Sequence, residues 1–199
     1  MKRISTHTLV TMAVLGALST LLFLLFEIPI FGNVYKLDFS NVPVLLAGFS
    51  MGPMPALGVA LLKDLFHLIL KGIGSTVGIG ELADFLMTAA FVLPASLVYR
   101  RVKTQEGALR GMIWGCVAMC VVAVPLNAFL MFPFYMSAFN MDLVAIGAAI
   151  GPLFGQDTGM VGLLLGATLP FNLLKGVVLC LLTYGIYKPL SPLLHGKKK

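Results

Sequence analysis

The sequence predicts an all-α integral membrane protein, a bundle of six transmembrane helices with external capping loops and both termini in the cytoplasm. Apolar residues make up 59% of the 199 residues. Charged residues make up only 11%, against roughly 25% in soluble domains. The mean hydropathy is +0.98, which excludes a soluble fold. Because the connections between apolar stretches are too short to fold separately, we expect one membrane domain over residues 1–199.

Six apolar stretches are typical of helices. The first continues to about residue 28, too far for the apolar region of a signal peptide, so we expect it to be retained. The second has Pro43 in its first turn, where proline is tolerated, and it is too short to cross roughly 30 Å of hydrocarbon alone. The fifth contains Pro125, which predicts a kink. The expected helices cover residues 7–28, 41–50, 56–71, 81–99, 109–135 and 158–187, and residues 188–199 form a basic cytoplasmic tail.

Lysine and arginine are distributed as expected for a protein with loops on two sides of a membrane. Ten of the fourteen basic residues fall in three clusters, whereas seven of the eight acidic residues lie elsewhere. The positive-inside rule places these clusters in the cytoplasm and the connections at 31–40, 72–80 and 137–156 outside. The clusters flank apolar stretches and lack interleaved aromatic residues, so we expect a lipid bilayer as surroundings and no nucleic acid as a partner. The clustered residues are Lys2, Arg3, Arg100, Arg101, Lys103, Arg110, Lys188, Lys197, Lys198 and Lys199.

A lysine inside the last apolar stretch points to a polar ligand. Lys175 carries a charge that costs roughly 2.5–3.5 kcal/mol near a bilayer midplane, and such residues usually face a cavity or a partner. Asn172 lies three residues earlier and shares its helical face. The pair supplies a cation, amide donors and an amide acceptor, which suit a ligand with carbonyl, ring-nitrogen or hydroxyl groups. The alternative is a structural pair that binds a neighbouring helix.

Other polar residues within apolar stretches are candidates for the same site. Asn127 follows Pro125, and a proline that removes a backbone hydrogen bond can aim a nearby side chain into a cavity. Glu81 begins a helix beside the glycine-rich loop and is expected to accept hydrogen bonds from a hydroxylated ligand; for Glu81 and Asp84 the alternative is stabilisation of a helix N-terminus. Lys63, Asp64 and His67 form a predicted polar seam, in which Asp64 pairs with a cation such as Lys175.

No pattern indicates catalysis or a metal site. Residues 72–78 lack the lysine and the preceding strand of a phosphate-binding loop, so we expect no ATP hydrolysis by this chain. Cys116, Cys120 and Cys180 lack metal-ligand spacing and are interpreted as small buried hydrophobic residues. We therefore predict no catalytic residue, no metal and no cofactor.

Five segments follow one another in order along about 190 residues. They are 35–43 (YKLDFSNVP), Gly52-Pro53 followed by Leu62-Lys63-Asp64 and His67, 78–85 (GIGELADF), Pro125-Leu126-Asn127, and 172–175 (NLLK). Together they resemble the substrate-binding S components of energy-coupling factor (ECF) vitamin transporters, in particular the riboflavin-specific ones.

The resemblance implies a six-helix subunit in the cell membrane of a prokaryote that captures riboflavin, or its monophosphate FMN, from outside. Asn127, Asn172 and Lys175 would contact the polar edge of the flavin. Residues 35–40 would form a lid, with Leu37 and Asp38 among the ligand contacts. Aromatic and methionine side chains would pack against the ring, although core or lipid contact is the alternative for each. These side chains are Phe129, Met131, Phe132, Phe134 and Tyr135.

The resemblance also implies partners. Ala13 and Ala17 form a small-xxx-small face on the first helix, and such faces permit close helix approach. In the family this face docks a membrane coupling subunit, which assembles with two cytoplasmic ATPases; packing within the chain is the alternative. Two other functions stay open: an S component for another vitamin, and an autonomous proton-coupled carrier that uses Asp64, His67 and Lys175.

Overall fold

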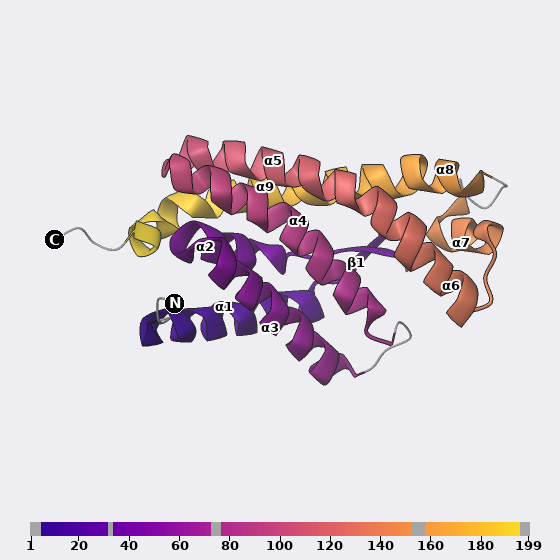
Figure 1. The fold of residues 1–199 in the computed structure, drawn as a ribbon, viewed down its shortest axis with the longest axis horizontal. Coiled ribbons are helices and arrows are strands. Elements are labelled where there is room, and N and C mark those ends of the chain that lie inside the picture. The colour runs from indigo at the N-terminus through magenta and orange to yellow at the C-terminus, as the bar shows by residue number, and fades with distance from the viewer. Residues whose placement is uncertain (1–4, 32–33, 73–76, 153–157, 196–199) are drawn as a thin grey trace.

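The chain forms an elongated helical bundle with one short β-hairpin inside it (Figure 1). The computed structural model describes residues 5–31, 34–72, 77–152 and 158–195. Helix α1 (Thr6–Leu25) is followed by β1 (Ile28–Phe31) and β2 (Tyr35–Leu37), which pair antiparallel. The hairpin corrects the all-α prediction. Its alternating pattern is too short to see in the sequence.

Helices α2 (Asn41–Met51) and α3 (Pro53–Lys71) follow the hairpin. Gly52 separates them with a φ of +96°, a backbone conformation that favours glycine, and Pro53 then begins α3, where its missing N–H costs nothing. Helix α4 (Ile79–Arg101) returns along the bundle, and α5 (Gln105–Leu126) begins at the cap that Thr104 provides by accepting from the Gly107 N–H.

The helices that follow α5 are interrupted by wider turns. Two π-helical segments, η1 (Asn127–Met131) and η3 (Leu164–Thr168), lie between regular helices, and η1 comes two residues after Pro125. The expected kink therefore takes the form of a π-helical widening. Helix α6 (Phe132–Ala138) continues η1, and α7 (Leu143–Ile150) lies in the expected connection at 137–156. Helices α8 (Gly159–Leu163) and α9 (Leu169–His195) flank η3.

Among the described residues, five helical stretches are long and apolar enough to cross a membrane: 6–25, 53–71, 79–101, 105–138 and 159–187. Helix α2 has eleven residues and is too short to do so alone. Helix α9 continues to His195, so the predicted tail from residue 188 is helical over most of its length. The basic residues Lys2, Arg3 and Lys197–Lys199 lie outside the described residues.

Close helix contacts at small residues hold the core together. Gly111 on α5 lies so near α4 that an added Cβ would meet the Ala95 carbonyl oxygen at 2.5 Å. Gly16 brings α1 against α3 in the same way, with Leu62 Cβ at 3.1 Å. The main core cluster lies between α2, α3, α4, α5 and α9. A second cluster joins the hairpin to η1, α6, α7, α8, η3 and α9. The candidate site lies at this second cluster.

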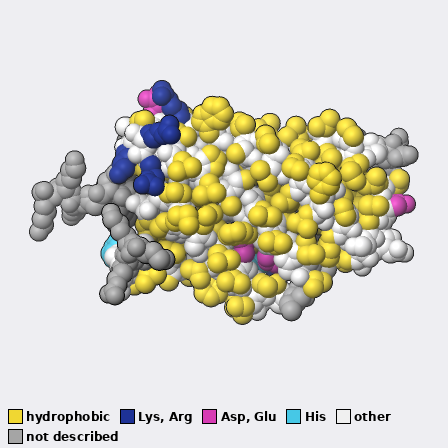
Figure 2. Space-filling model, in the orientation of Figure 1, with side chains coloured by type: hydrophobic (Ala, Val, Ile, Leu, Met, Phe, Trp, Pro, Cys, Tyr) yellow, Lys and Arg dark blue, Asp and Glu magenta, His cyan; other side chains and the backbone are white. Residues whose placement is uncertain are grey.

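The two ends of the bundle differ in charge. Helix α1 begins and α9 ends at the same end of the molecule, where α4 also leads into α5 (Figure 1). On the face drawn in Figure 2, lysine and arginine side chains gather at that end, and hydrophobic side chains cover the middle. The α4–α5 connection carries Arg100, Arg101 and Lys103. The charge distribution is that of a membrane-spanning bundle with one basic end.

Candidate functional site

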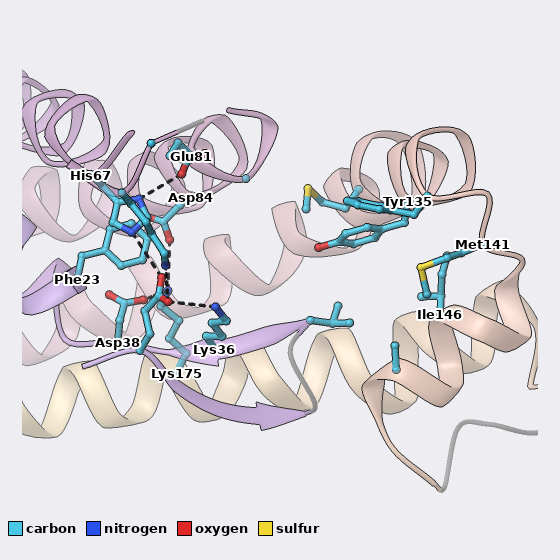
Figure 3. Close-up of a pocket in the computed structure, with 18 residues that line it drawn as sticks. Phe23, Lys36, Asp38, His67, Glu81, Asp84, Tyr135, Met141, Ile146 and Lys175 are labelled. Carbon is cyan, nitrogen blue, oxygen red and sulfur yellow. Dashed lines mark hydrogen bonds and ion pairs between the residues drawn. The ribbon is translucent and has the colours of Figure 1, made fainter. Parts of the chain in front are cut away.

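A cavity of about 440 Å³ lies between the hairpin, the adjoining ends of α3 and α4, and helices α6 and α7. Its two walls differ in chemistry (Figure 3). Charged side chains gather on one side, and Tyr135, Met141 and Ile146 lie on the other. The lining residues are Phe23, Glu27, Val34, Lys36, Asp38, His67, Lys71, Gly72, Gly80, Glu81, Asp84, Met131, Tyr135, Phe139, Met141, Ile146, Ala149 and Lys175.

The charged wall centres on Lys175. Its Nζ donates to Asp38 Oδ2 at 2.8 Å and to Asp84 Oδ1 at 3.4 Å. Asp84 also accepts from Lys63, which is fully buried on α3. A chain of alternating charges therefore runs from the end of the hairpin through α9 and α4 to α3. We call Asp38, Lys175, Asp84 and Lys63 the buried charge network.

Local structure positions Asp38 in this network. Asp38 directly follows β2 and accepts hydrogen bonds from the Ser40 N–H, at 2.9 Å, and the Ser40 hydroxyl. This turn aims the free carboxylate oxygen at Lys175. The network then satisfies charges that would otherwise be costly in a membrane interior.

A second group of charges surrounds Glu27 at the wall of the same cavity. Its Oε2 accepts from Lys36 at 3.0 Å and from Lys71 at 2.5 Å, and its Oε1 lies 3.5 Å from His67 Nε2. The other ring nitrogen of His67 lies 3.1 Å from Glu81 Oε1. Burial alone would raise the pKa of Glu27, but the hydrogen bonds and charges of Lys71 and Lys36 outweigh it and lower that pKa. The contacts tie the hairpin to the ends of α3 and α4.

A smaller cavity of about 140 Å³ adjoins the first and shares Lys36, Asp84, Tyr135 and Lys175 among its lining residues. Asn127 and Asn172 line it. Each asparagine Nδ2 donates to the carbonyl oxygen four residues earlier, Ala123 at 2.9 Å and Thr168 at 2.8 Å. Both amides are thereby held in a fixed orientation at the wall.

Tyr35 joins the hairpin to these amides. Its hydroxyl donates to Asn127 Oδ1 at 3.2 Å and lies 2.6 Å from Thr168 Oγ1. Burial raises the pKa of Tyr35, so the phenol keeps its proton as a donor. Among the described residues Asn172 Oδ1 accepts no hydrogen bond, so this oxygen is available to a ligand.

The structure brings five of the six expected ligand residues together. Lys175, Asp38 and Glu81 line the larger cavity, and Asn127, Asn172 and Lys175 line the smaller one. Leu37 is buried and lines neither cavity. Of the expected aromatic and methionine residues, Met131 and Tyr135 line both cavities.

Other expectations need correction. Asp64 contacts Lys63, at 3.2 Å, and Lys175 pairs with Asp38 and Asp84 instead. The reason is that Lys63 is adjacent to Asp64 on α3, whereas the hairpin and α4 reach Lys175. Phe129 is 82% exposed and Phe132 is completely buried, and neither lines a cavity. Glu27, Lys36 and Lys71 line the larger cavity and were not predicted as ligand contacts. An acidic residue at the end of an apolar helix, as at Glu27, is a signal that could have identified one of them.

Comparison with known families matches residues 7–187 to the family described as ECF transporter, substrate-specific component. The chain belongs to this family. A solved structure, that of the S component of a bacterial ECF transporter, is 28% identical to the chain and has a TM-score of 0.71. The match covers 94% of this chain and 97% of the solved one.

Curated relatives span almost the same length. The riboflavin transporter RibU of Staphylococcus aureus (strain TCH60) is 31% identical, over 92% of this chain and 89% of its own length. The riboflavin transporter RibU of Streptococcus thermophilus is also 31% identical, over 96% and 85%. The riboflavin transporter FmnP of Bacillus subtilis (strain 168) is 25% identical, over 96% and 95%. These relatives are transport proteins.

Proposed function

We propose that this chain is the riboflavin-binding subunit of an ATP-driven ECF-type vitamin importer, with riboflavin or its monophosphate FMN as the transported ligand. The observation that carries the proposal is the two-sided cavity, charged on one wall and rich in aromatic and methionine side chains on the other. Riboflavin has an apolar dimethylbenzene end and a polar pyrimidine end. The volume of about 440 Å³ lies in the range of roughly 300–1,000 Å³ that is typical of small-molecule sites.

Asn127, Asn172 and Lys175 are the proposed contacts for the polar edge of the flavin. They border one cavity and carry donors and acceptors that the pyrimidine carbonyls and ring nitrogens complement. Asp38 and Glu81 are proposed to accept from ligand hydroxyl or N–H groups. Tyr135 and Met131 would pack against the ring. Because Lys175 is already paired with Asp38, a ligand acceptor would share or replace that contact.

The hairpin is the proposed lid. It is joined to the site through Tyr35, which contacts Asn127 on η1, and through Asp38, directly after β2, which contacts Lys175 on α9. We propose that the hairpin and α2 together make the return passage, so that the chain crosses the membrane six times. The basic end, with both termini, would then be cytoplasmic, and the cavity end would face outside.

Ala13 and Ala17 are the proposed docking face for the membrane coupling subunit, which would act with two cytoplasmic ATPases. Both alanines are exposed on α1, whereas Gly16 between them packs against α3. A face of small exposed residues permits another helix to approach closely. Ala13→Trp with Ala17→Trp is expected to prevent assembly while flavin binding stays unchanged. Val161→Trp, at another exposed position, is the control.

The test of the proposed function is a fluorescence titration of the purified protein in detergent with riboflavin and with FMN. Quenching of flavin fluorescence with a sub-micromolar midpoint is the expected result. Unchanged fluorescence, with binding of a different vitamin by calorimetry, would instead favour an S component for that vitamin. ATP-independent uptake into vesicles that requires a proton gradient would favour the autonomous carrier.

A further inference from the structure

Asp64 has an unusual environment for a carboxyl group. It lies on α3, is 5% exposed, and lines neither cavity. Among the described residues, no well-aligned hydrogen-bond donor faces either of its side-chain oxygens. Its one ionic neighbour among them is Lys63, whose Nζ lies 3.2 Å from Oδ1. An ionised carboxylate without hydrogen bonds is costly in such a place.

Lys63 cannot serve Asp64 as a dedicated partner. Its Nζ donates to Asp84 and also reaches Ser40 Oγ at 3.5 Å and Asn41 Oδ1 at 3.4 Å. It also lies 4.9 Å from the ring centroid of Phe23. Asp64 and Asp84 therefore share one ammonium group, that of Lys63. Two carboxyl groups this close together do not both ionise easily, because their negative charges repel.

The charge balance of the buried charge network also favours a neutral Asp64. The buried charge network has two ammonium groups, on Lys63 and Lys175, and two carboxylates, on Asp38 and Asp84. These four balance. An ionised Asp64 would add an uncompensated negative charge.

Among the described residues, no cation other than Lys63 pairs with Asp64. Residues 8–26, which include most of α1, contain no Asp, Glu, Lys, Arg or His, and neither does α2. Helix α4 places Glu81 and Asp84 near this part of α3, whereas its two cations, Arg100 and Arg101, lie in its last turn, where Arg100 borders Gly52 at the start of α3. Helix α9 supplies Lys175, which is bound to Asp38 and Asp84. His67, one turn further along α3, faces Glu27 and Glu81.

We propose that Asp64 is a proton-binding site whose carboxyl group is protonated in the folded protein, which leaves the buried charge network neutral. A proton fits better than a metal ion, because hard cations take several oxygen ligands and the Lys63 ammonium already occupies one side of the carboxyl group. Among the described residues no group of three or more His, Cys, Asp or Glu side chains is arranged to hold a metal ion. The proposal is independent of the identity of the transported ligand.

The test compares Asp64→Asn with Asp84→Asn in the full-length protein in detergent. Asparagine has the shape and neutrality of a protonated aspartic acid, so D64N is expected to shift the thermal unfolding midpoint by no more than about 2 °C. D84N leaves Lys63 and Lys175 short of a partner, and its midpoint is expected to fall by roughly 6–20 °C, or the variant fails to fold. A D64N protein that fails to fold, or loses as much as D84N, would show that Asp64 is ionised.

Infrared spectroscopy gives an independent readout on the wild-type protein. A carbonyl stretch of a protonated carboxylic acid is expected, shifted in D₂O and missing from D64N. A wild-type spectrum without this band, or a D64N spectrum that retains it, overturns the proposal. So does a fall in the wild-type unfolding midpoint when choline replaces Na⁺ at constant ionic strength, since that would identify a metal ion as the neutralising species.

Discussion

Lys175→Met is expected to destabilise the fold as well as weaken ligand binding, and removal of Asp38 should reverse part of the damage. At an effective dielectric constant of about 20, Coulomb attraction is about 6 kcal/mol for the 2.8 Å contact with Asp38 and about 5 kcal/mol for the 3.4 Å contact with Asp84. Desolvation offsets much of this, and loss of one partner from a buried pair costs about 3–5 kcal/mol. K175M should lose that amount because Asp38 then has no ammonium partner among the described residues and Asp84 keeps only Lys63.

A double-mutant cycle separates the pair from the rest of the site. The proteins are wild type, K175M, Asp38→Asn and the double variant, and the free energy of unfolding is measured by denaturant titration in micelles. D38N should cost less than K175M, because Lys175 keeps Asp84. The double variant should be more stable than K175M, with a coupling energy of about 1–3 kcal/mol. Lys103→Met, at an exposed position, should change stability by less than about 0.5 kcal/mol. Additive effects of K175M and D38N, within about 0.5 kcal/mol, would refute the reasoning.

Three further predictions follow from individual contacts. Asn172→Ala should weaken flavin binding about tenfold or more in the fluorescence titration, since a ligand donor loses its acceptor, whereas Leu173→Ala on the exposed side should leave affinity unchanged. Gly111→Ala should lower the free energy of unfolding by about 1–3 kcal/mol, because its Cβ meets a backbone oxygen, whereas Gly185→Ala, with nothing within 4 Å, should not lower it. The pKa of Glu27 is lowered in the folded protein, so its ionised form stabilises the fold above the ordinary value of 4.5, and this contribution is lost as the pH falls through the lowered pKa. The difference in unfolding midpoint between wild type and Glu27→Gln should therefore shrink below about pH 4.5, and a constant difference would contradict it.

Long apolar stretches could be predicted from the sequence because the bilayer imposes their length and composition. The expected boundaries of α2 and α3 lie within three residues of the observed ones. The hairpin could not be predicted in this way. Strand β2 has only three residues, and its pairing depends on contacts such as that of Tyr35 with Thr168, which lies 133 residues further along the chain. No local pattern encodes such a contact.

The candidate site was predictable as a set of residue types and not as a set of pairs. Lys175, Asn172 and Asn127 were found because polar residues are rare in apolar stretches, and all three line one cavity. The predicted pairing of Lys175 with Asp64 was wrong. The sequence alone does not distinguish Asp38, Asp64 and Asp84 as partners, because all three are aspartates near apolar stretches. Only the position of the hairpin relative to α9 selects Asp38.

The contacts that hold the hairpin in place use the same atoms that would bind a ligand. Tyr35 donates to Asn127 Oδ1, and Asp38 accepts from Lys175 Nζ. A ligand that hydrogen-bonds to Asn127 or Lys175 therefore competes with a hairpin contact. Such a ligand would move the hairpin between a closed and an open position only as far as its affinities for the two positions differ. If the hairpin acts as the proposed lid, this shared use of donors and acceptors would link occupancy of the cavity to the position of the hairpin without any additional element.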